Sequence, residues 1–148
     1  MTVVKIILAA AKAAKVPGAL LLAICAHESA DFSLSHNPND RGTPSYGVCQ
    51  VKEATAKMFG FKNEPILLDG PRTSAKYAAL YMKYQIDRYG EENWCKLTAA
   101  YNAGTYNESK KHPGKPRNLE YVQLVQKKLE ESLQPKLSCN SEELAEAK

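Results

Sequence analysis

Residues 17–32 read PGALLLAICAHESADF and have Glu28 at the end of an apolar segment. Pro17 suits the first turn of a helix, and the alanines and leucines continue that helix to about Ser29. Charged side chains are rarely buried unless they are paired or functional, and this stretch has no lysine or arginine that could pair with the carboxylate. Glu28 is therefore either a solvent-exposed residue at a helix end or a functional acid.

Two features of the predicted helix favour a functional role for Glu28. The residue lies in the last turn, where the negative end of the helix dipole disfavours a carboxylate. Its helical neighbours Ile24 and Cys25 are apolar, so the side chain is expected to be partly desolvated. Both effects raise the pKa of a carboxyl group. A glutamic acid that stays protonated near neutral pH can serve as a general acid.

The rest of the chain predicts a mainly α fold, because apolar residues recur at helical spacing along most of it. The expected helices cover residues 3–15, 17–29, 52–59, 73–89, 93–103 and 119–133. Residues 30–46 are rich in Asn, Asp, Ser, Pro and Gly and predict a long loop or a short irregular hairpin. We expect one domain over residues 1–134 and a flexible polar tail over 135–148, where Asn140 and Glu143 could cap a short turn but fraying is favoured.

The net charge of +4 is mild for 148 residues. It suits an anionic partner such as a bacterial wall and is too small to argue for nucleic acid. No uninterrupted apolar segment reaches the roughly 18 residues of a membrane span, so no membrane insertion is expected. Lysines divide the apolar N-terminal stretch and argue against a signal peptide. We expect a protein made in the cytoplasm from about Met1, with a leader missing from this sequence as the alternative.

The cysteines are isolated, with no C-x-x-C pair to suggest zinc or redox chemistry. They are Cys25, Cys49, Cys95 and Cys139. The first three have apolar neighbours and are expected to be small buried thiols. The alternative is a disulfide, for which Cys25 and Cys49 are the first pair to test. The three histidines are too scattered to predict a metal site, and we expect neither a metal nor a cofactor.

Two further motifs could contribute a binding site. Residues 46–51, YGVCQV, have a glycine before a predicted helix, and Gln50, whose amide can donate to and accept from sugar hydroxyl and N-acetyl groups. Residues 99–104, AAYNAG, have Tyr101 and Asn102 at a helix end, where a ring could pack on a sugar and an amide could hold it. The structural alternatives are a surface glutamine, a core tyrosine and a helix-terminal asparagine.

These motifs occur in the order E-S-x-x-F, G-x-x-Q-V, A-Y-N-A-G and a late Tyr-Val pair. Over roughly residues 16–129 this order resembles the SLT-type lytic transglycosylases, which have a goose-type lysozyme-like fold with an active-site cleft and cleave peptidoglycan glycan strands. The resemblance implies that Glu28 is the single catalytic acid/base. It also implies glycan contacts or catalytic support from Ser45, Tyr46, Gln50, Tyr101, Asn102 and Tyr121.

The chain departs from the family pattern at three points. Two residues separate Ser29 from Phe32 where one is more usual, Cys49 stands where methionine is common, and the loop between Glu28 and Gln50 is somewhat longer than in many members. These departures affect the detailed glycan contacts rather than the expected fold.

Residues 39–51, NDRGTPSYGVCQV, also resemble a loop of the hen-type lysozymes, with Ser45 where those enzymes have their second catalytic aspartate. Hydrolysis ordinarily uses two carboxylates that flank the bond. Asp31 and Asp40 are the nearby alternatives, but both fit the loop as Asx-turn formers. The resemblance therefore implies that Glu28 acts alone on the β-1,4 bond between N-acetylmuramic acid and N-acetylglucosamine, leaving a 1,6-anhydromuramyl end.

Two other functions compete with this one: a goose-type muramidase that hydrolyses the same bond, and a non-catalytic wall-binding or virion structural module. A compact domain without a leader or wall-anchoring repeat resembles a bacteriophage endolysin or virion-associated lysin, which would act on the wall in the host periplasm or in the virion. We expect a monomer whose partner is peptidoglycan. The basic loop at residues 109–118, SKKHPGKPRN, is either a solvated face or a contact for anionic wall polymers.

Overall fold

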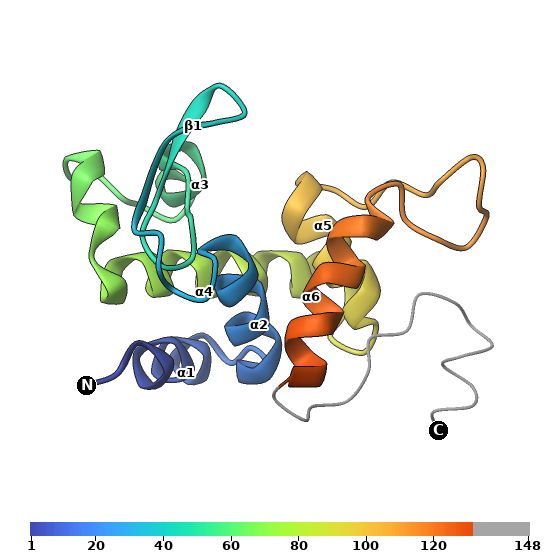
Figure 1. The fold of residues 1–148 in the computed structure, drawn as a ribbon, viewed down its shortest axis with the longest axis horizontal. Coiled ribbons are helices and arrows are strands. Elements are labelled where there is room, and N and C mark those ends of the chain that lie inside the picture. The colour runs from blue at the N-terminus through green and yellow to red at the C-terminus, as the bar shows by residue number, and fades with distance from the viewer. Residues whose placement is uncertain (132–148) are drawn as a thin grey trace. The chain divides into compact units, whose positions relative to one another are not determined.

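In the computed structural model, residues 1–131 are described, and they are mainly helical, as the sequence predicts. They contain six α-helices, one 3₁₀ helix and a two-stranded antiparallel sheet (Figure 1). The chain divides into two compact units, Met1–Lys83 and Tyr84–Lys148, and α4 contributes to both.

The first unit begins with two helices that pack on each other, α1 (Val3–Ala14) and α2 (Gly18–Glu28). Thr2 caps α1 by accepting a hydrogen bond from a backbone N–H of the first turn. Pro17 precedes α2, and its fixed φ suits the entry to a helix. Leu20 and other large apolar residues of α2 are fully buried, so this helix lies in the core of the unit.

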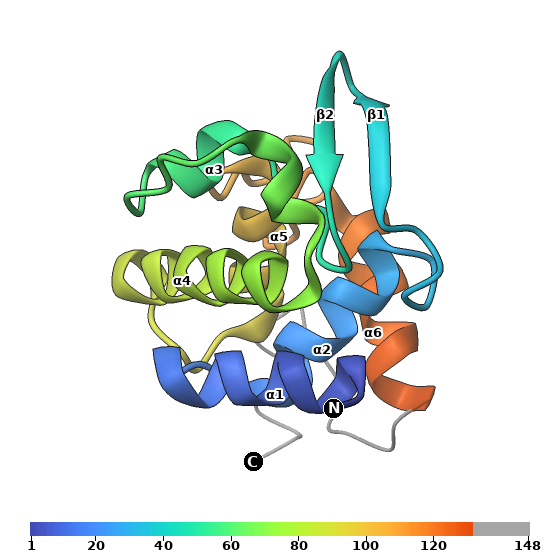
Figure 2. The ribbon, with the colours of Figure 1, turned by 90° about the vertical axis from the view of Figure 1, so that its left-hand side faces the viewer.

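A β-hairpin follows α2, formed by β1 (His36–Asp40) and β2 (Thr43–Tyr46) (Figure 2). Asn37 pairs with Ser45, and the register is irregular between Asn37 and Asp40. Left-handed residues at Arg41 and Gly42 connect the strands, which is the backbone that a tight hairpin turn requires. Of the two structures expected for residues 30–46, the irregular hairpin is therefore the correct one.

The first unit continues through α3 (Glu53–Lys57), a 3₁₀ helix η1 (Pro65–Asp69) and the start of α4 (Pro71–Tyr89). Sequence analysis did not predict η1, which is too short to show an apolar period, and it started α4 two residues late. The buried residues of α4 include Ala75, Ala78 and Met82. These small and flexible side chains allow close packing of α4 in the core.

The second unit holds the end of α4 together with α5 (Trp94–Ala103) and α6 (Leu119–Glu131), which pack on each other. Asn93 caps α5 by accepting a hydrogen bond from the N–H of Lys96 at 3.0 Å. Gly104 ends α5 with a φ of 87°. Buried residues of these two helices include Leu97 of α5 and Val122, Val125 and Leu129 of α6.

Several expectations from the sequence concern residues after Glu131. The tail at 135–148, with Cys139, Asn140 and Glu143, lies outside the described residues, and the domain boundary at residue 134 stays a prediction. Within residues 1–131, no helix combines the length and apolarity needed to cross a membrane.

Candidate active site

Glu28 is the last residue of α2 and its side chain is half-buried. The next residue, Ser29, is fully buried; its hydroxyl donates to the Cys25 carbonyl at 2.8 Å and accepts from the Phe32 N–H at 2.9 Å. Residues 30–32 then have φ values of 49°, 58° and 69°, which form a left-handed turn of non-glycine residues. Such residues each cost about 1 kcal/mol, and strain of this kind clusters at functional sites. The general-acid role of Glu28 stays a prediction.

Ser45 and Gln50, two predicted glycan contacts, are bonded to each other. The Ser45 hydroxyl is fully buried and donates to Gln50 Oε1 at 2.6 Å. Gln50 Nε2 donates to the Gly47 carbonyl oxygen at 2.8 Å. The structure therefore brings these residues together and uses both side chains to hold the backbone of the turn. Their contact with glycan stays a prediction.

The segment between them is a four-residue turn rather than a helix start. Tyr46 and Val51 close it with two backbone hydrogen bonds of 2.9 Å, and the Gln50 N–H donates to the Gly47 carbonyl at 3.0 Å. Gln50 itself is left-handed, with a φ of 49°. The helix predicted for residues 52–59 is α3, which begins at Glu53, so Gln50 lies in this buried turn and not at a helix start on the surface.

Ser74, in the first turns of α4, binds both sides of this turn. Its hydroxyl accepts from the Cys49 N–H at 3.1 Å and donates to the Tyr46 carbonyl at 3.0 Å. Gly47 has a φ of +78°, and a Cβ atom there would collide with the Ser74 side chain and lie 2.6 Å from the Leu68 carbonyl oxygen. Glycine is therefore required at position 47 for its conformation and for the close approach of α4.

A disulfide joins Cys25 and Cys49, with their Cα atoms 4.1 Å apart. It ties the turn to α2 about one helical turn before Glu28. The alternative expectation, a disulfide between Cys25 and Cys49, is confirmed, and the favoured expectation of free buried thiols was wrong, although Cys25, Cys49 and Cys95 are all buried. Apolar neighbours along the chain indicate burial only, whereas a disulfide depends on residues that the fold brings together. Cys95 is also in a disulfide, and Cys139 lies outside the described residues.

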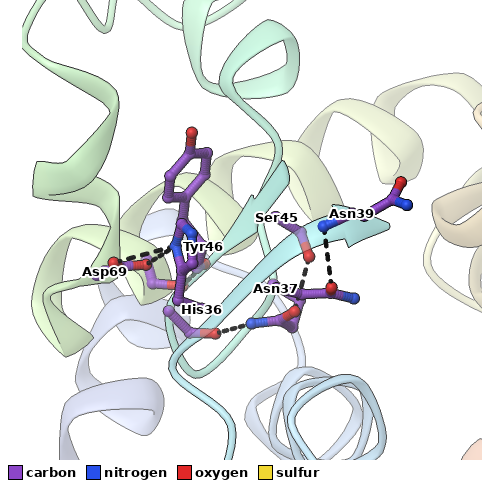
Figure 3. A network of polar contacts seen from close by, with 9 residues as sticks. His36, Asn37, Asn39, Ser45, Tyr46 and Asp69 are labelled. Carbon is purple, nitrogen blue, oxygen red and sulfur yellow. Dashed lines mark hydrogen bonds and ion pairs between the residues drawn. The ribbon is translucent and has the colours of Figure 1, made fainter. Parts of the chain in front are cut away.

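Tyr46 is buried, and its ring packs edge-on against the His36 ring, with centroids 5.2 Å apart. His36 Nδ1 lies 3.3 Å from each carboxylate oxygen of Asp69, at the end of η1 (Figure 3). Because neighbours on a strand point to opposite faces, Tyr46 lies on the other face from Ser45. The Tyr46 ring therefore belongs to a packed cluster that sequence analysis did not predict.

The other carboxylates considered as a second acid lie in the loop and hairpin. Asp31 is exposed, within the left-handed turn after α2. Asp40 ends β1, where its backbone carbonyl accepts a hydrogen bond of 2.6 Å from Lys52 Nζ. Of the other polar side chains here, Asn37 Oδ1 accepts from the Asn39 N–H at 3.2 Å (Figure 3).

In the second unit, the predicted residues Tyr101 and Asn102 lie in the last turn of α5, and Tyr121 lies in the first turn of α6. All three side chains are half-buried. Asn118 Nδ2 donates to Asn102 Oδ1 at 2.8 Å and to the Ala99 carbonyl at 3.0 Å. Asn102 is therefore held by a residue from the start of α6.

The end of α5 is also bonded to side chains of α4. Gln85, which is fully buried, donates through Nε2 to the Ala100 carbonyl at 3.3 Å and to the Gly104 carbonyl at 3.0 Å. Arg88 Nη1 donates to the same Gly104 carbonyl at 2.7 Å. These bonds satisfy carbonyl groups that a helix leaves without intrahelical partners at its C-terminus.

Beside this helix end, the hydroxyls of Tyr89 and Thr105 are 2.8 Å apart, and the Tyr106 N–H donates to the Tyr89 oxygen at 3.0 Å. The hydrogen bond with the Thr105 hydroxyl and the hydrogen bond from the Tyr106 N–H both lower the pKa of Tyr89, because each stabilises the phenolate. Burial raises the pKa of Tyr106. Lys96 Nζ lies over both tyrosine rings, 5.3 Å and 4.9 Å from their centroids.

Ser74, Gln85 and Asn118 were missed by sequence analysis. Gln85 gave a signal, because it is a polar residue four positions after an apolar one, Tyr81, on the predicted helix 73–89. Asn118 reads as an ordinary helix cap. Ser74 carries no signal, because its partners are distant in sequence.

Residues 1–131 hold no metal cluster, and a groove lies apart from the residues described above. No group of three His, Cys, Asp or Glu side chains there could hold a metal ion. A groove of about 400 Å³ runs between α1 and α4, lined by Ile6, four alanines of α1, Arg72, Lys76 and Leu80. It contains none of the predicted site residues.

Residues 5–123 match the family model described as "Transglycosylase SLT domain". The chain is also 33% identical over 99 residues to Protein IpgF of Shigella sonnei and, equally, to Protein IpgF of Shigella flexneri. Each alignment covers 65% of this chain and 63% of the relative, so the chain spans less than two thirds of the length of these curated proteins. No solved structure matches significantly. The family match covers most of the chain and agrees with the helical fold and small hairpin: the protein belongs to the SLT transglycosylase family, with its lysozyme-like fold.

Proposed function

We propose that this protein is a peptidoglycan lytic transglycosylase. It cleaves the β-1,4 bond between N-acetylmuramic acid and N-acetylglucosamine and leaves a 1,6-anhydromuramyl end. The observation that carries the proposal is the position of Glu28 at the end of α2, in a chain of the SLT family, with a serine where two-carboxylate lysozymes have their second acid.

In the proposed reaction, Glu28 first protonates the glycosidic oxygen of the leaving sugar. The substrate's own N-acetyl group stabilises the cationic centre at C1, as in substrate-assisted glycosidases. The Glu28 carboxylate then takes the proton from the muramyl C6 hydroxyl, and the C6 oxygen bonds to C1. The proton that Glu28 donates is thus replaced, and water is not consumed.

Ser45 and three aspartates of the first unit are the nearby candidates for a second catalytic group, and their surroundings support a one-acid mechanism. Ser45 is fully buried and its hydroxyl donates to Gln50, so it cannot replace a carboxylate as a base. Asp69 is paired with His36. Asp31 and Asp40 belong to tight backbone structure in the turn after α2 and the end of β1.

The experiment is mass spectrometry of the muropeptides that the purified protein releases from sacculi. We expect products lighter by one water than those of a muramidase. Glu28→Gln should keep the fold and lose nearly all activity, at least the roughly 10²–10⁴-fold that proton transfer contributes. Its thermal midpoint should match the parent, which separates lost chemistry from lost structure.

Three outcomes would contradict the proposal. Reducing-end products would identify a goose-type muramidase. Saturable wall binding without release of products would identify a binding or virion structural module. Full activity of Glu28→Gln would mean that another residue is the acid.

We also propose the biological setting, a bacteriophage endolysin or virion-associated lysin that acts as a monomer on the host wall. Its support is the small lysozyme-like domain and the mild positive charge, which suits an anionic wall. Turbidity loss of permeabilised cells, compared with intact cells, tests whether the wall is reached only after the membrane is breached.

A further inference from the structure

Asn118 immediately precedes α6, and its carbonyl accepts the hydrogen bond of the Val122 N–H at 3.3 Å. An asparagine here usually caps its own helix by accepting a backbone N–H through its side-chain oxygen. The described contacts of Asn118 instead lead to another helix. Its Nδ2 donates to the Ala99 carbonyl at 3.0 Å and to Asn102 Oδ1 at 2.8 Å, and both acceptors belong to α5.

These two bonds fix the orientation of both amides. A backbone carbonyl can only accept, so the Asn118 atom that faces Ala99 must be the nitrogen. The same nitrogen faces Asn102, so the Asn102 atom that meets it must be the oxygen. The oxygen and nitrogen of a side-chain amide are usually hard to tell apart, but the Ala99 backbone carbonyl removes that ambiguity for both asparagines.

One consequence concerns the other end of Asn102. Its oxygen is occupied, while its NH₂ group donates to no protein atom within residues 1–131. The side chain is half-buried, and within residues 1–131 its nitrogen is not among the fully buried side-chain atoms that lack a partner, so this donor keeps some exposure. Asn102 therefore presents a donor outward and keeps its acceptor turned inward.

We infer that Asn118 is a positioning residue that makes Asn102 a hydrogen-bond donor toward the glycan. Asn102 then recognises an acceptor oxygen of the sugar and rejects a group that can only donate. This inference rests on the proposed function, because it takes glycan as the ligand of Asn102. It adds a residue outside the A-Y-N-A-G motif and assigns the polarity of the contact.

The test is a double-mutant cycle with Asn118→Asp and Asn102→Ala. Aspartate is nearly isosteric with asparagine but cannot donate through its ionised side chain. The Asn102 amide should therefore flip, so that its NH₂ group donates to the new carboxylate and no longer to the glycan. Binding to purified sacculi is measured in the Glu28→Gln background, which prevents turnover. Each single variant should weaken binding by about fivefold to tenfold, the value of one hydrogen bond. The double variant should be no weaker than Asn102→Ala alone.

Asn107→Asp is the matched control, because Asn107 Nδ2 also donates to a backbone carbonyl, that of Thr105 at 3.4 Å, without touching Asn102. It introduces the same charge in the same unit and should change binding less than twofold. Asn118→Ala provides a second variant if the aspartate destabilises the fold. It frees the Asn102 amide to rotate and should lose about threefold in binding. All variants are compared below their thermal midpoints.

The outcomes separate this inference from the proposed function. Losses that multiply in the double variant, or unchanged binding by Asn118→Asp and Asn118→Ala, would overturn the role of Asn118 even if the parent releases anhydro products. Coupled losses in a protein that releases no anhydro products would contradict the proposed function alone. A parent protein that does not bind sacculi would overturn both.

Discussion

Two regions of the molecule carry most of the predicted site residues, and they are held by different means. The turn closed by Tyr46 and Val51 is buried, joined to α2 by a disulfide and clamped by the Ser74 hydroxyl. The end of α5 is held by hydrogen bonds from Gln85, Arg88 and Asn118, while its own predicted site residues stay half-buried.

This difference indicates which predicted residues support the structure and which are available to contact glycan. Ser45 donates to Gln50 Oε1, and Gln50 Nε2 donates to the Gly47 carbonyl, so their main effect is to keep the turn in one shape. Asn102 has an accessible donor at the end of α5. We therefore expect substitutions in the turn to lower the stability of the fold, and substitutions at the end of α5 to weaken glycan binding.

Removal of the disulfide by Cys25→Ser with Cys49→Ser should cause the largest loss of stability. The bond closes a loop with a sequence separation of 24, for which chain entropy predicts a loss of about 3.5 kcal/mol in the free energy of unfolding. Urea unfolding of the double variant at 25 °C measures it. A loss below about 1 kcal/mol would mean that the Ser74 clamp and packing alone hold the turn.

Gly47→Ala should cost about 2–3 kcal/mol, from a left-handed backbone and from overlap with Ser74 and the Leu68 carbonyl. Gly114→Ala is the matched control, because its φ of +86° is similar and nothing lies within 4 Å of an added Cβ. It should cost only the backbone contribution, about 1 kcal/mol. Equal losses in urea unfolding would show that the approach of α4 to the turn is not tight.

Gln85→Leu should cost about 1–2 kcal/mol, because it removes donors from two carbonyls while keeping a side chain of similar size. Amide hydrogen exchange should accelerate over residues 101–104 and stay unchanged over 46–50. This pattern would sharpen the comparison by showing that the end of α5 loosens independently. Equal acceleration in both segments would mean that the two regions open together.

Sequence analysis located the helices well, because apolar periodicity is a local property of the chain. It predicted α5 as residues 93–103, within one residue of its observed start at Trp94. It failed where the cause lies in three dimensions. The Cys25–Cys49 disulfide was expected only as the alternative to free thiols, because its residues are 24 apart in sequence, and Ser74 was missed because it bonds a turn 25 and 28 positions away.

The candidate site shows the same limit. The motifs identified Glu28 and Asn102 by residue type and order, and both lie at helix ends as predicted. The residue that bonds Asn102 could not be predicted, because Asn118 looks like a cap of its own helix and instead bonds to α5. A sequence shows which side chain can donate or accept, but the fold decides which partner it meets.

The smallest expected effect concerns two tyrosines beside the end of α5. The pKa of Tyr89 is lowered chiefly by Thr105, while burial raises the pKa of Tyr106, so Tyr89 should ionise first in an NMR titration of the ring Cζ signals. Thr105→Val should raise the pKa of Tyr89 and leave that of Tyr106 nearly unchanged.

The sign of the linked stability change follows from the same pKa difference. A phenol whose folded pKa is lowered contributes stability that is fully present above its unfolded value of 10.0 and is lost as pH falls through the folded value. Thr105→Val should therefore destabilise the protein more at pH 10.5 than at pH 7, where both states keep the phenol protonated. Tyr89→Phe supplies the control, because on that background Thr105→Val should show no such pH dependence. An equal loss at both pH values in the parent background would mean that Thr105 acts only by holding the loop and not by stabilising the Tyr89 phenolate.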